Sequence, residues 1–228
     1  MNDIVYFVKE SPVNEELVYS IRTVVENFPY RHIWVYGGCP ANLYFGEYHV
    51  PHKQVGMKWN RVRNMLRTAC DNENISEDFW LFNDDFFIVK PVEKPQNYYH
   101  GTLEQLADEI EDRAHPSIYT MRLRELASLL KSEGYETKNY ALHVPMLINR
   151  KKMAQVLDNY KGTPMFRALY GNYWRIGGTD REDVKIRQYV PLDYMGNIDM
   201  ISSSDMTWIR PVGTFVRKRF PQKSRFEI

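Results

Sequence analysis

Two adjacent carboxylates interrupt an apolar, aromatic run at residues 79–90, which reads FWLFNDDFFIVK. Asp84 and Asp85 follow Asn83 in the middle of this run, and an unpaired buried charge must be neutralised, paired or bound to a metal ion. Strands of an open α/β sheet deliver their carboxyl ends to the ligand crevice, so a strand that ends at Phe82 would present both carboxylates there. Hard cations such as Mg²⁺ or Mn²⁺ take oxygen ligands of this kind and are often completed by the diphosphate oxygens of a substrate. A tight hairpin turn, in which Asn-Asp pairs are common, is the alternative interpretation.

Three further stretches carry side chains suited to the same chemistry. In IGGTDREDVKI (176–186) two glycines precede Glu182 and Asp183, and an acidic residue at the start of a following helix is the right type for a general base. A favourable charge at a helix N-terminus is the competing interpretation. His143 lies in an apolar run and could complete a Mn²⁺ site, although a lone histidine there is more often a satisfied core residue. The helix before the acidic run carries Lys58, Asn60, Arg61 and Arg63. These side chains could contact phosphates, and the alternative interpretation is that they form a solvated helix face.

The apolar pattern predicts the elements that must position these side chains. Residues 3–9 and 32–38 are typical of strands, and the helical spacing of apolar residues over 11–29 lies between them. This β-α-β opening favours a parallel sheet with a right-handed crossover. The pattern continues with helices over 56–71, 102–113, 117–134 and 150–160, a strand or strand pair over 79–89, a strand over 141–149, and a stretch over 164–186 that combines a helix, a glycine turn and another helix start. The prediction is one α/β domain over 1–228, with a mixed, mostly parallel, Rossmann-like sheet flanked by helices and a small helical insertion at 102–134.

Composition narrows the class of protein. The chain has 228 residues, of which 43% are hydrophobic and 26% charged, which suits a soluble globular domain with a sizeable core. Its net charge of +1 argues against a general polyanion binder. Cys39 and Cys70 make no disulfide framework, so buried free thiols in a reducing compartment are expected. No segment approaches the ~18 apolar residues of a membrane span, and the sequence predicts a cytoplasmic protein.

Taken together, these motifs resemble those of the nucleotide-sugar transferases of GT-A type. In that family a strand-terminal acidic motif holds a metal that grips the diphosphate of the donor, and FNDDFF is similar to that motif. IGGTDREDVKI resembles the stretch that carries the acceptor-side base in several inverting members, which makes Asp183 the expected base and Glu182 the second choice. The resemblance implies a GT-A-like fold, a nucleotide-diphosphate sugar as donor (a UDP-sugar first), and Mn²⁺ or Mg²⁺ as cofactor. The metal ligands expected are Asp84, Asp85 and His143, and the donor contacts expected are Arg22, Lys58, Asn60, Asn83 and Asp84.

A second resemblance, to the Stealth-type sugar-phosphate transferases, extends over most of the chain. Similar blocks occur in the same order: DIVYFVK (3–9), NEELVYSIR (14–22), KWNRVRN (58–64), LFNDDFF (81–87) and HVP (143–145). FRALYGNYW (166–174) is similar to the family's last block and makes Arg167 a catalytic candidate. The chain departs from the family at Lys9-Glu10 and at Arg63-Asn64-Met65, where the family carries a glutamate thought to act in catalysis. The small size is also similar to that of compact glycosyltransferases of bacteriophage genomes, which implies the host cytoplasm as location.

The sequence therefore predicts a metal-dependent glycosyltransferase that moves a sugar to an acceptor hydroxyl on modified DNA, a protein or a glycan. A Stealth-like sugar-1-phosphate transferase is the alternative enzyme. The alternative of another class is a non-catalytic nucleic-acid or protein-binding module, based on the basic tail at 211–228. There Phe215, Phe220 and Phe226 interleave with cations and could stack beside phosphates. A solvated or product-covering tail is the other interpretation of that segment.

Overall fold

The opening β-α-β unit forms as predicted in the computed structural model, which describes residues 1–53, 55–111 and 117–228. β1 (Asp3–Val8) and β2 (Ile33–Gly37) pair in parallel, and α1 (Glu15–Asn27) connects them. The side chain of Asn14 accepts a hydrogen bond from the backbone N–H of Leu17 and caps α1. The helix therefore begins at Glu15, inside the predicted range.

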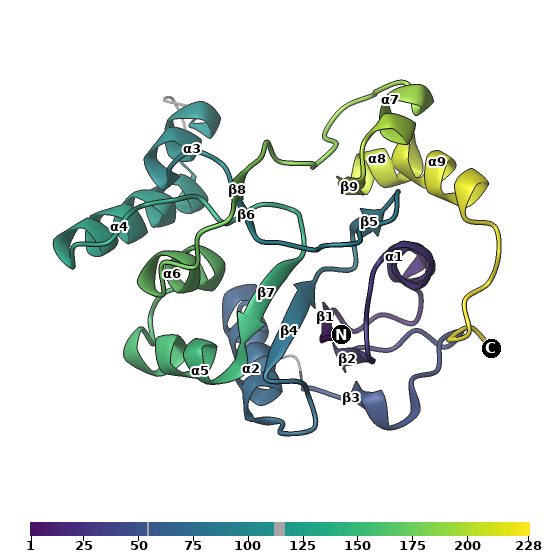
Figure 1. The fold of residues 1–228 in the computed structure, drawn as a ribbon, viewed down its shortest axis with the longest axis horizontal. Helices are drawn as coiled ribbons and strands as arrows, with labels where there is room; N and C mark the ends of the chain where they lie inside the picture. The colour runs from purple at the N-terminus through teal and green to yellow at the C-terminus, as the bar shows by residue number, and fades with distance from the viewer. Residues whose placement is uncertain (54, 112–116) are drawn as a thin grey trace.

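The central sheet has the strand order β3-β2-β1-β4-β7 (Figure 1). β3 (His49–Val50) runs parallel to β2 and β4 (Asp78–Phe82) runs parallel to β1, whereas β7 (Met146–Asn149) is antiparallel to β4. The predicted mixed, mostly parallel sheet is thus confirmed. The strand predicted over 141–149 is wrong for 141–145, because the carbonyls of Leu142 and Val144 accept hydrogen bonds from a side chain and Pro145 has no N–H to donate.

Helices cover both faces of this sheet, which explains why its strands read as continuous apolar runs. On one face Val5 and Tyr36 pack with Leu66 of α2 (Lys58–Asp71), and α5 (Arg150–Asn159) belongs to the same apolar cluster. On the other face Ile4 and Tyr6 pack with Ile21 of α1. Successive side chains of β1 point to opposite faces of the sheet, so they belong alternately to the two apolar clusters.

The second half of the apolar run at 79–89 leaves the central sheet. β5 (Phe86–Ile88) pairs antiparallel with β9 (Met200–Ser202), and β6 (Tyr98–Tyr99) pairs in parallel with β8 (Thr179–Asp180). The run is therefore a strand pair, but its two strands belong to different sheets. In Figure 1 the segment between β8 and β9 leads to α7, and within it Lys185 contacts Asp85 in the turn after β4.

The predicted helical insertion contains α3 (Leu103–Ile110) and α4 (Ile118–Ser132), which pack against each other. The last two residues of the helix predicted over 102–113 lie outside the described residues. α4 ends as expected at Gly134, whose φ is +77°, and the N–H of Tyr135 bonds to the carbonyl of Leu130. The chain then continues through β7 and α5 to α6 (Phe166–Tyr173).

The C-terminal segment is part of the folded core. In Figure 1 three short helices follow one another near β5 and β9: α7 (Leu192–Asn197), α8 (Asp205–Ile209) and α9 (Val212–Arg219). Elsewhere in the fold, a 3₁₀ turn, η1 (Gly46–Tyr48), precedes β3. The predicted stacking of the tail aromatics beside phosphates is wrong, because Phe215 and Phe220 are only 8% and 2% exposed, and Phe226 stacks on Phe45. Arg217 pairs with Glu15 of α1 and Arg219 donates to the carbonyl of Val89, so these two cations of the tail have partners within the fold.

The sequence also predicts free cysteines and the absence of a membrane span. Both cysteines are free as predicted, with Cys70 buried and Cys39 half-buried. In the part of the chain that the structure describes, every helix is too short or too polar to cross a bilayer.

Candidate active site

Asp84 and Asp85 lie in the turn between β4 and β5, at the carboxyl end of a central strand. β5 pairs with β9 rather than with β4, so the hairpin interpretation of this turn is wrong. The position is the one that the sequence predicts, since ligands of open α/β sheets bind outside the carboxyl ends of the strands.

Each of these carboxylates has a partner from a distant part of the chain. Asp85 Oδ2 lies 2.6 Å from Lys185 Nζ and accepts a hydrogen bond from Ser202 Oγ at 3.1 Å. The Asp85 and Lys185 side chains are only 17% and 16% exposed, so their ion pair is poorly screened by water. Asp84 Oδ2 accepts a hydrogen bond of 2.6 Å from the Asn14 side-chain amide, so Asn14 both caps α1 and holds Asp84.

A third carboxylate, Glu16, adds to the negative charge at this end of the sheet. Its side chain accepts a hydrogen bond from Ser203. Burial raises the pKa of Glu16, and the charges of Asp84 and Asp85 raise it further. Burial also raises the pKa of Asp84, opposed by the hydrogen bond from Asn14 and reinforced by Asp85. Lys185 lowers both pKa values, so its ammonium acts on all three carboxylates.

The chemistry of this carboxylate cluster fits a hard divalent cation, since its donors are carboxylate oxygens and the ammonium of Lys185 already stands in as a cation at Asp85. The predicted three-ligand set is not gathered, however. Among residues 1–53, 55–111 and 117–228, no three His, Cys, Asp or Glu side chains are grouped so that they could hold a metal ion. His143 in particular is held by another partner, Asp183.

Asp183 clamps His143 through both of its oxygens. The backbone N–H of His143 donates to Oδ1 at 2.9 Å, and Nδ1 of the ring lies 2.8 Å from Oδ2. Burial alone would raise the pKa of Asp183, but the hydrogen bonds and charge of His143 outweigh it and lower that pKa to about 2. A carboxylate with so low a pKa accepts a proton poorly, so Asp183 is suited to fix the ring with Nδ1 protonated and Nε2 carrying the lone pair.

The helix start predicted after Gly178 is wrong, because residues 181–190 contain no helix and Lys185 forms a parallel bridge with Ser202 of β9. The N–H of Ile186 bonds to the carbonyl of Ser202, and the N–H of Ser202 bonds to the carbonyl of Val184. Asp183 therefore does not serve as a charge at a helix N-terminus. In an extended chain, residues two apart lie on the same side, which lets Asp183 reach His143 while Lys185 reaches Asp85.

Arg167, predicted as catalytic, supports the segment that carries His143. Its guanidinium donates to the carbonyl of Leu142 at 3.0 Å and to the carbonyl of Val144, the two neighbours of His143. Burial lowers the pKa of Arg167 to about 10, opposed by the charges of Asp183 and Asp85. The side chain therefore stays charged at neutral pH and acts on the site through the backbone of 142–144.

The remaining predicted site residues are placed less favourably. Asn83 shares the turn of Asp84 and Asp85, and Glu182 precedes Asp183, but both side chains are exposed. Lys58 and Asn60 are exposed too, and no contact among the described residues connects them to the carboxylates. Arg22 pairs with Glu227 at 2.7 Å and donates to the carbonyl of Phe220, so it ties α1 to the C-terminal segment. Five residues of the site are not predicted from the sequence: Asn14, Glu16, Lys185, Ser202 and Ser203. The period-two spacing of Asp183 and Lys185 is the signal that could have identified Lys185, but the predicted helix start concealed it.

A stability measurement tests the clamp on His143. We expect Asp183→Asn to lower the free energy of unfolding at pH 7 by about 2 kcal/mol, since the native pKa lies near 2 and the unfolded one near 3.8. Because the native pKa is depressed, this contribution is complete above pH 4 and disappears as the pH falls towards 2. Urea unfolding from pH 7 to pH 2 should show the gap between wild type and variant closing. Asp180→Asn is the matched control, since it removes an exposed Asp–His pair with the same 2.8 Å distance, and a pH-independent gap for Asp183→Asn would contradict the interpretation.

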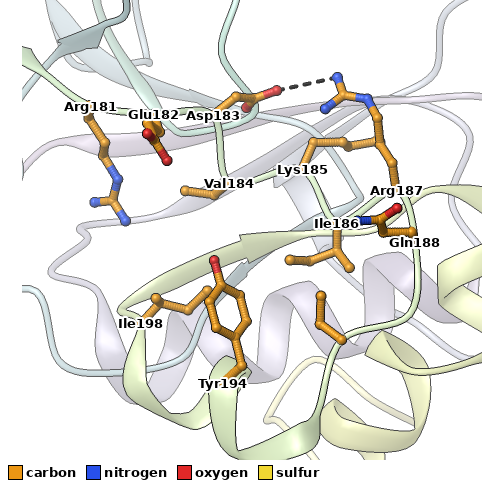
Figure 2. A pocket seen from close by; sticks show the side chains of 11 residues that line it. Arg181, Glu182, Asp183, Val184, Lys185, Ile186, Arg187, Gln188, Tyr194 and Ile198 are labelled. Carbon is orange, nitrogen blue, oxygen red and sulfur yellow. Dashed lines mark hydrogen bonds and ion pairs between the residues drawn. The ribbon is translucent and has the colours of Figure 1, made fainter.

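A pocket of about 550 Å³ lies between the extended segment 181–190 and α7 (Figure 2). Asp183 and Lys185, which hold the two halves of the site, both line it. Figure 2 shows Asp183 joined to Arg187, at a distance of 3.4 Å, and the hydroxyl of Tyr194 directed towards Val184 across the pocket. The pocket therefore adjoins the His143–Asp183 pair.

Comparison with known proteins bears on the fold. No protein-family model matches the chain, and no curated protein matches it in sequence. The galactosyltransferase LgtC in complex with donor and acceptor sugar analogs superposes with a TM-score of 0.50 and 12% identity, over 96% of this chain and 94% of LgtC. The apo form of the glycosyltransferase GlyE of Streptococcus pneumoniae TIGR4 gives 0.41 and 10% identity over 79% of this chain, which spans 45% of the GlyE chain. Mouse xyloside xylosyltransferase 1 gives 0.41 and 6% identity over 99% of this chain and 96% of its own. The match to LgtC, which covers nearly all of both chains, establishes that this chain has the GT-A type of α/β fold.

Proposed function

We propose that this protein is a glycosyltransferase that moves a sugar from a nucleotide-diphosphate sugar, a UDP-sugar first, to an acceptor hydroxyl. One observation carries the proposal: the half-buried carboxylates Asp84 and Asp85 lie at the carboxyl end of β4 in a chain that shares its fold with LgtC. Fold alone does not determine chemistry, so the argument rests on the residues at that position.

The donor side of the site is the carboxylate cluster. Asp84 and Asp85 would hold Mn²⁺ or Mg²⁺, which when bound supplies positive charge to the departing nucleoside diphosphate. Lys185 balances the negative charge of Asp85. Asn14 and Ser202 hold the two carboxylates in place through the hydrogen bonds described above.

The acceptor side of the site is the His143–Asp183 pair. The oxygen of the acceptor hydroxyl attacks the anomeric carbon, its proton passes to Nε2 of His143, and the bond from that carbon to the diphosphate oxygen breaks. Asp183 stabilises the resulting imidazolium without taking the proton itself, as its low pKa requires. The general-base role predicted for Asp183 thus moves to His143, with Asp183 and Arg167 as its supports.

Nucleotide release tests the proposal directly. We expect the protein with Mn²⁺ to cleave at least one member of a panel of UDP-, GDP- and ADP-sugars and to release the nucleoside diphosphate. Release of the monophosphate instead would support the alternative, sugar-1-phosphate transfer. A ligand present at 100 times its dissociation constant should stabilise the protein by about 2.7 kcal/mol, which a thermal-shift screen detects. A panel that gives neither a shift nor nucleotide release would contradict the proposal. The cytoplasmic location and the bacteriophage origin stay predictions from the sequence.

A further inference from the structure

We propose that the pocket between 181–190 and α7 binds the acceptor of this reaction, and that the part it binds is a neutral pyranoside ring. That the ligand is the acceptor depends on the proposed function. That the pocket binds a neutral sugar is argued from the pocket itself. Its volume of about 550 Å³ falls in the range of small-molecule sites, which are apolar with a few placed polar groups.

The floor of the pocket is apolar and includes one aromatic ring. Val184 and Ile186 are largely buried, and Ile198 lies opposite them across the pocket (Figure 2). The side chain of Tyr194 is 52% exposed and presents its ring and hydroxyl to this space. An amphipathic ring of this kind offers a face to the C–H groups of a sugar and a hydroxyl to one of its oxygens.

The positive charges on the wall of the pocket are already paired. Lys185 pairs with Asp85, Arg187 with Asp183, and Arg181 with Asp199. Each cation of the wall therefore already has a carboxylate beside it, which lowers its attraction for a diphosphate. A neutral ligand with hydroxyl groups can instead hydrogen-bond to Glu182 and Gln188, which line the pocket and are exposed.

The wall also connects the pocket to the base. Asp183 belongs to the lining of the pocket and holds His143, so the pocket and the proposed base share one segment of the chain. Lys185 lines the same wall and holds Asp85, so the donor and acceptor halves of the site meet at residues 183–185. This continuity distinguishes the pocket from a surface hollow without a role.

Binding of simple sugars tests the inference without knowledge of the natural acceptor. The probes are the methyl β-pyranosides of glucose, galactose, mannose and xylose, titrated by saturation-transfer NMR, with UDP titrated on the same samples. We expect at least one pyranoside to bind the wild type, and Tyr194→Ala to lower the ratio of pyranoside affinity to UDP affinity about tenfold. Ile198→Trp, which fills the pocket, should have the same effect.

Tyr189→Ala is the matched control, because Tyr189 is 76% exposed, belongs to the same segment and does not line the pocket. It should bind the pyranosides as the wild type does. The inference is overturned if no pyranoside binds, if Tyr189→Ala and Tyr194→Ala behave alike, or if affinity for pyranoside and UDP falls in parallel. Pyranoside binding in a protein that cleaves no nucleotide sugar would instead overturn the proposed function and leave the sugar site standing.

Discussion

Asp85→Asn is expected to lower the rate of donor cleavage by at least about 10²-fold, the cost of removing one preorganised electrostatic group from an active site. The change removes a negative charge from the carboxyl end of β4 and leaves the ammonium of Lys185, only 16% exposed, without its partner. The measurement is the release of nucleoside diphosphate from the nucleotide sugar that the wild type accepts, with Mn²⁺ present.

Lys185→Met separates the chemical role of Asp85 from its structural one. Both substitutions break the same 2.6 Å ion pair, so both should cost similar stability in urea unfolding. Only Asp85→Asn removes a carboxylate, and we therefore expect Lys185→Met to lose much less activity. Equal losses of activity in the two variants would show that the ion pair matters only for folding, and the role proposed for Asp85 would have to be abandoned.

The second large effect is expected at the acceptor side, where His143→Gln should slow sugar transfer by about 10²–10⁴-fold, the usual contribution of a general base. Asp183→Asn should cost about as much. Its amide can still accept the backbone N–H of His143 through one atom, but its NH₂ group cannot accept Nδ1–H, so the ring adopts the tautomer with Nε2 protonated and unable to take a proton.

The matched control for this pair of variants is His100→Gln. His100 and Asp180 form an exposed pair with the same 2.8 Å separation, and nothing connects them to the carboxylate cluster among the described contacts. Transfer is measured with an excess of acceptor at fixed donor concentration. Full activity in His143→Gln, together with a large loss in Glu182→Gln, would show that the general base belongs to the acidic pair Glu182 and Asp183, as the sequence predicts.

Much of the fold follows from local patterns. The apolar run along 3–8 and the apolar spacing of α1 predict the β-α-β opening, because these signals act between residues close in sequence. The same reasoning places Asp84 and Asp85 at a strand end, where the structure has them. The prediction of an open basic tail is wrong, because a helix as short as α9 gives only a weak pattern of apolar residues in the sequence. The burial of α9 depends on contacts with β5 and β9, which are distant in sequence.

The sequence by itself determined the type of fold and the place where the two central carboxylates emerge. Only the tertiary structure decided their partners, since Asn14 is 70 residues from Asp84, Lys185 is 100 from Asp85, and Asp183 is 40 from His143. Two of these contacts depend on the pairing of β9 with β5, because Ser202 of β9 bridges to Lys185 and brings residues 183–185 to the end of β4. Periodicity reports which side of an element is apolar, but not which distant strand it will pair with, and that pairing turns scattered charges into a site.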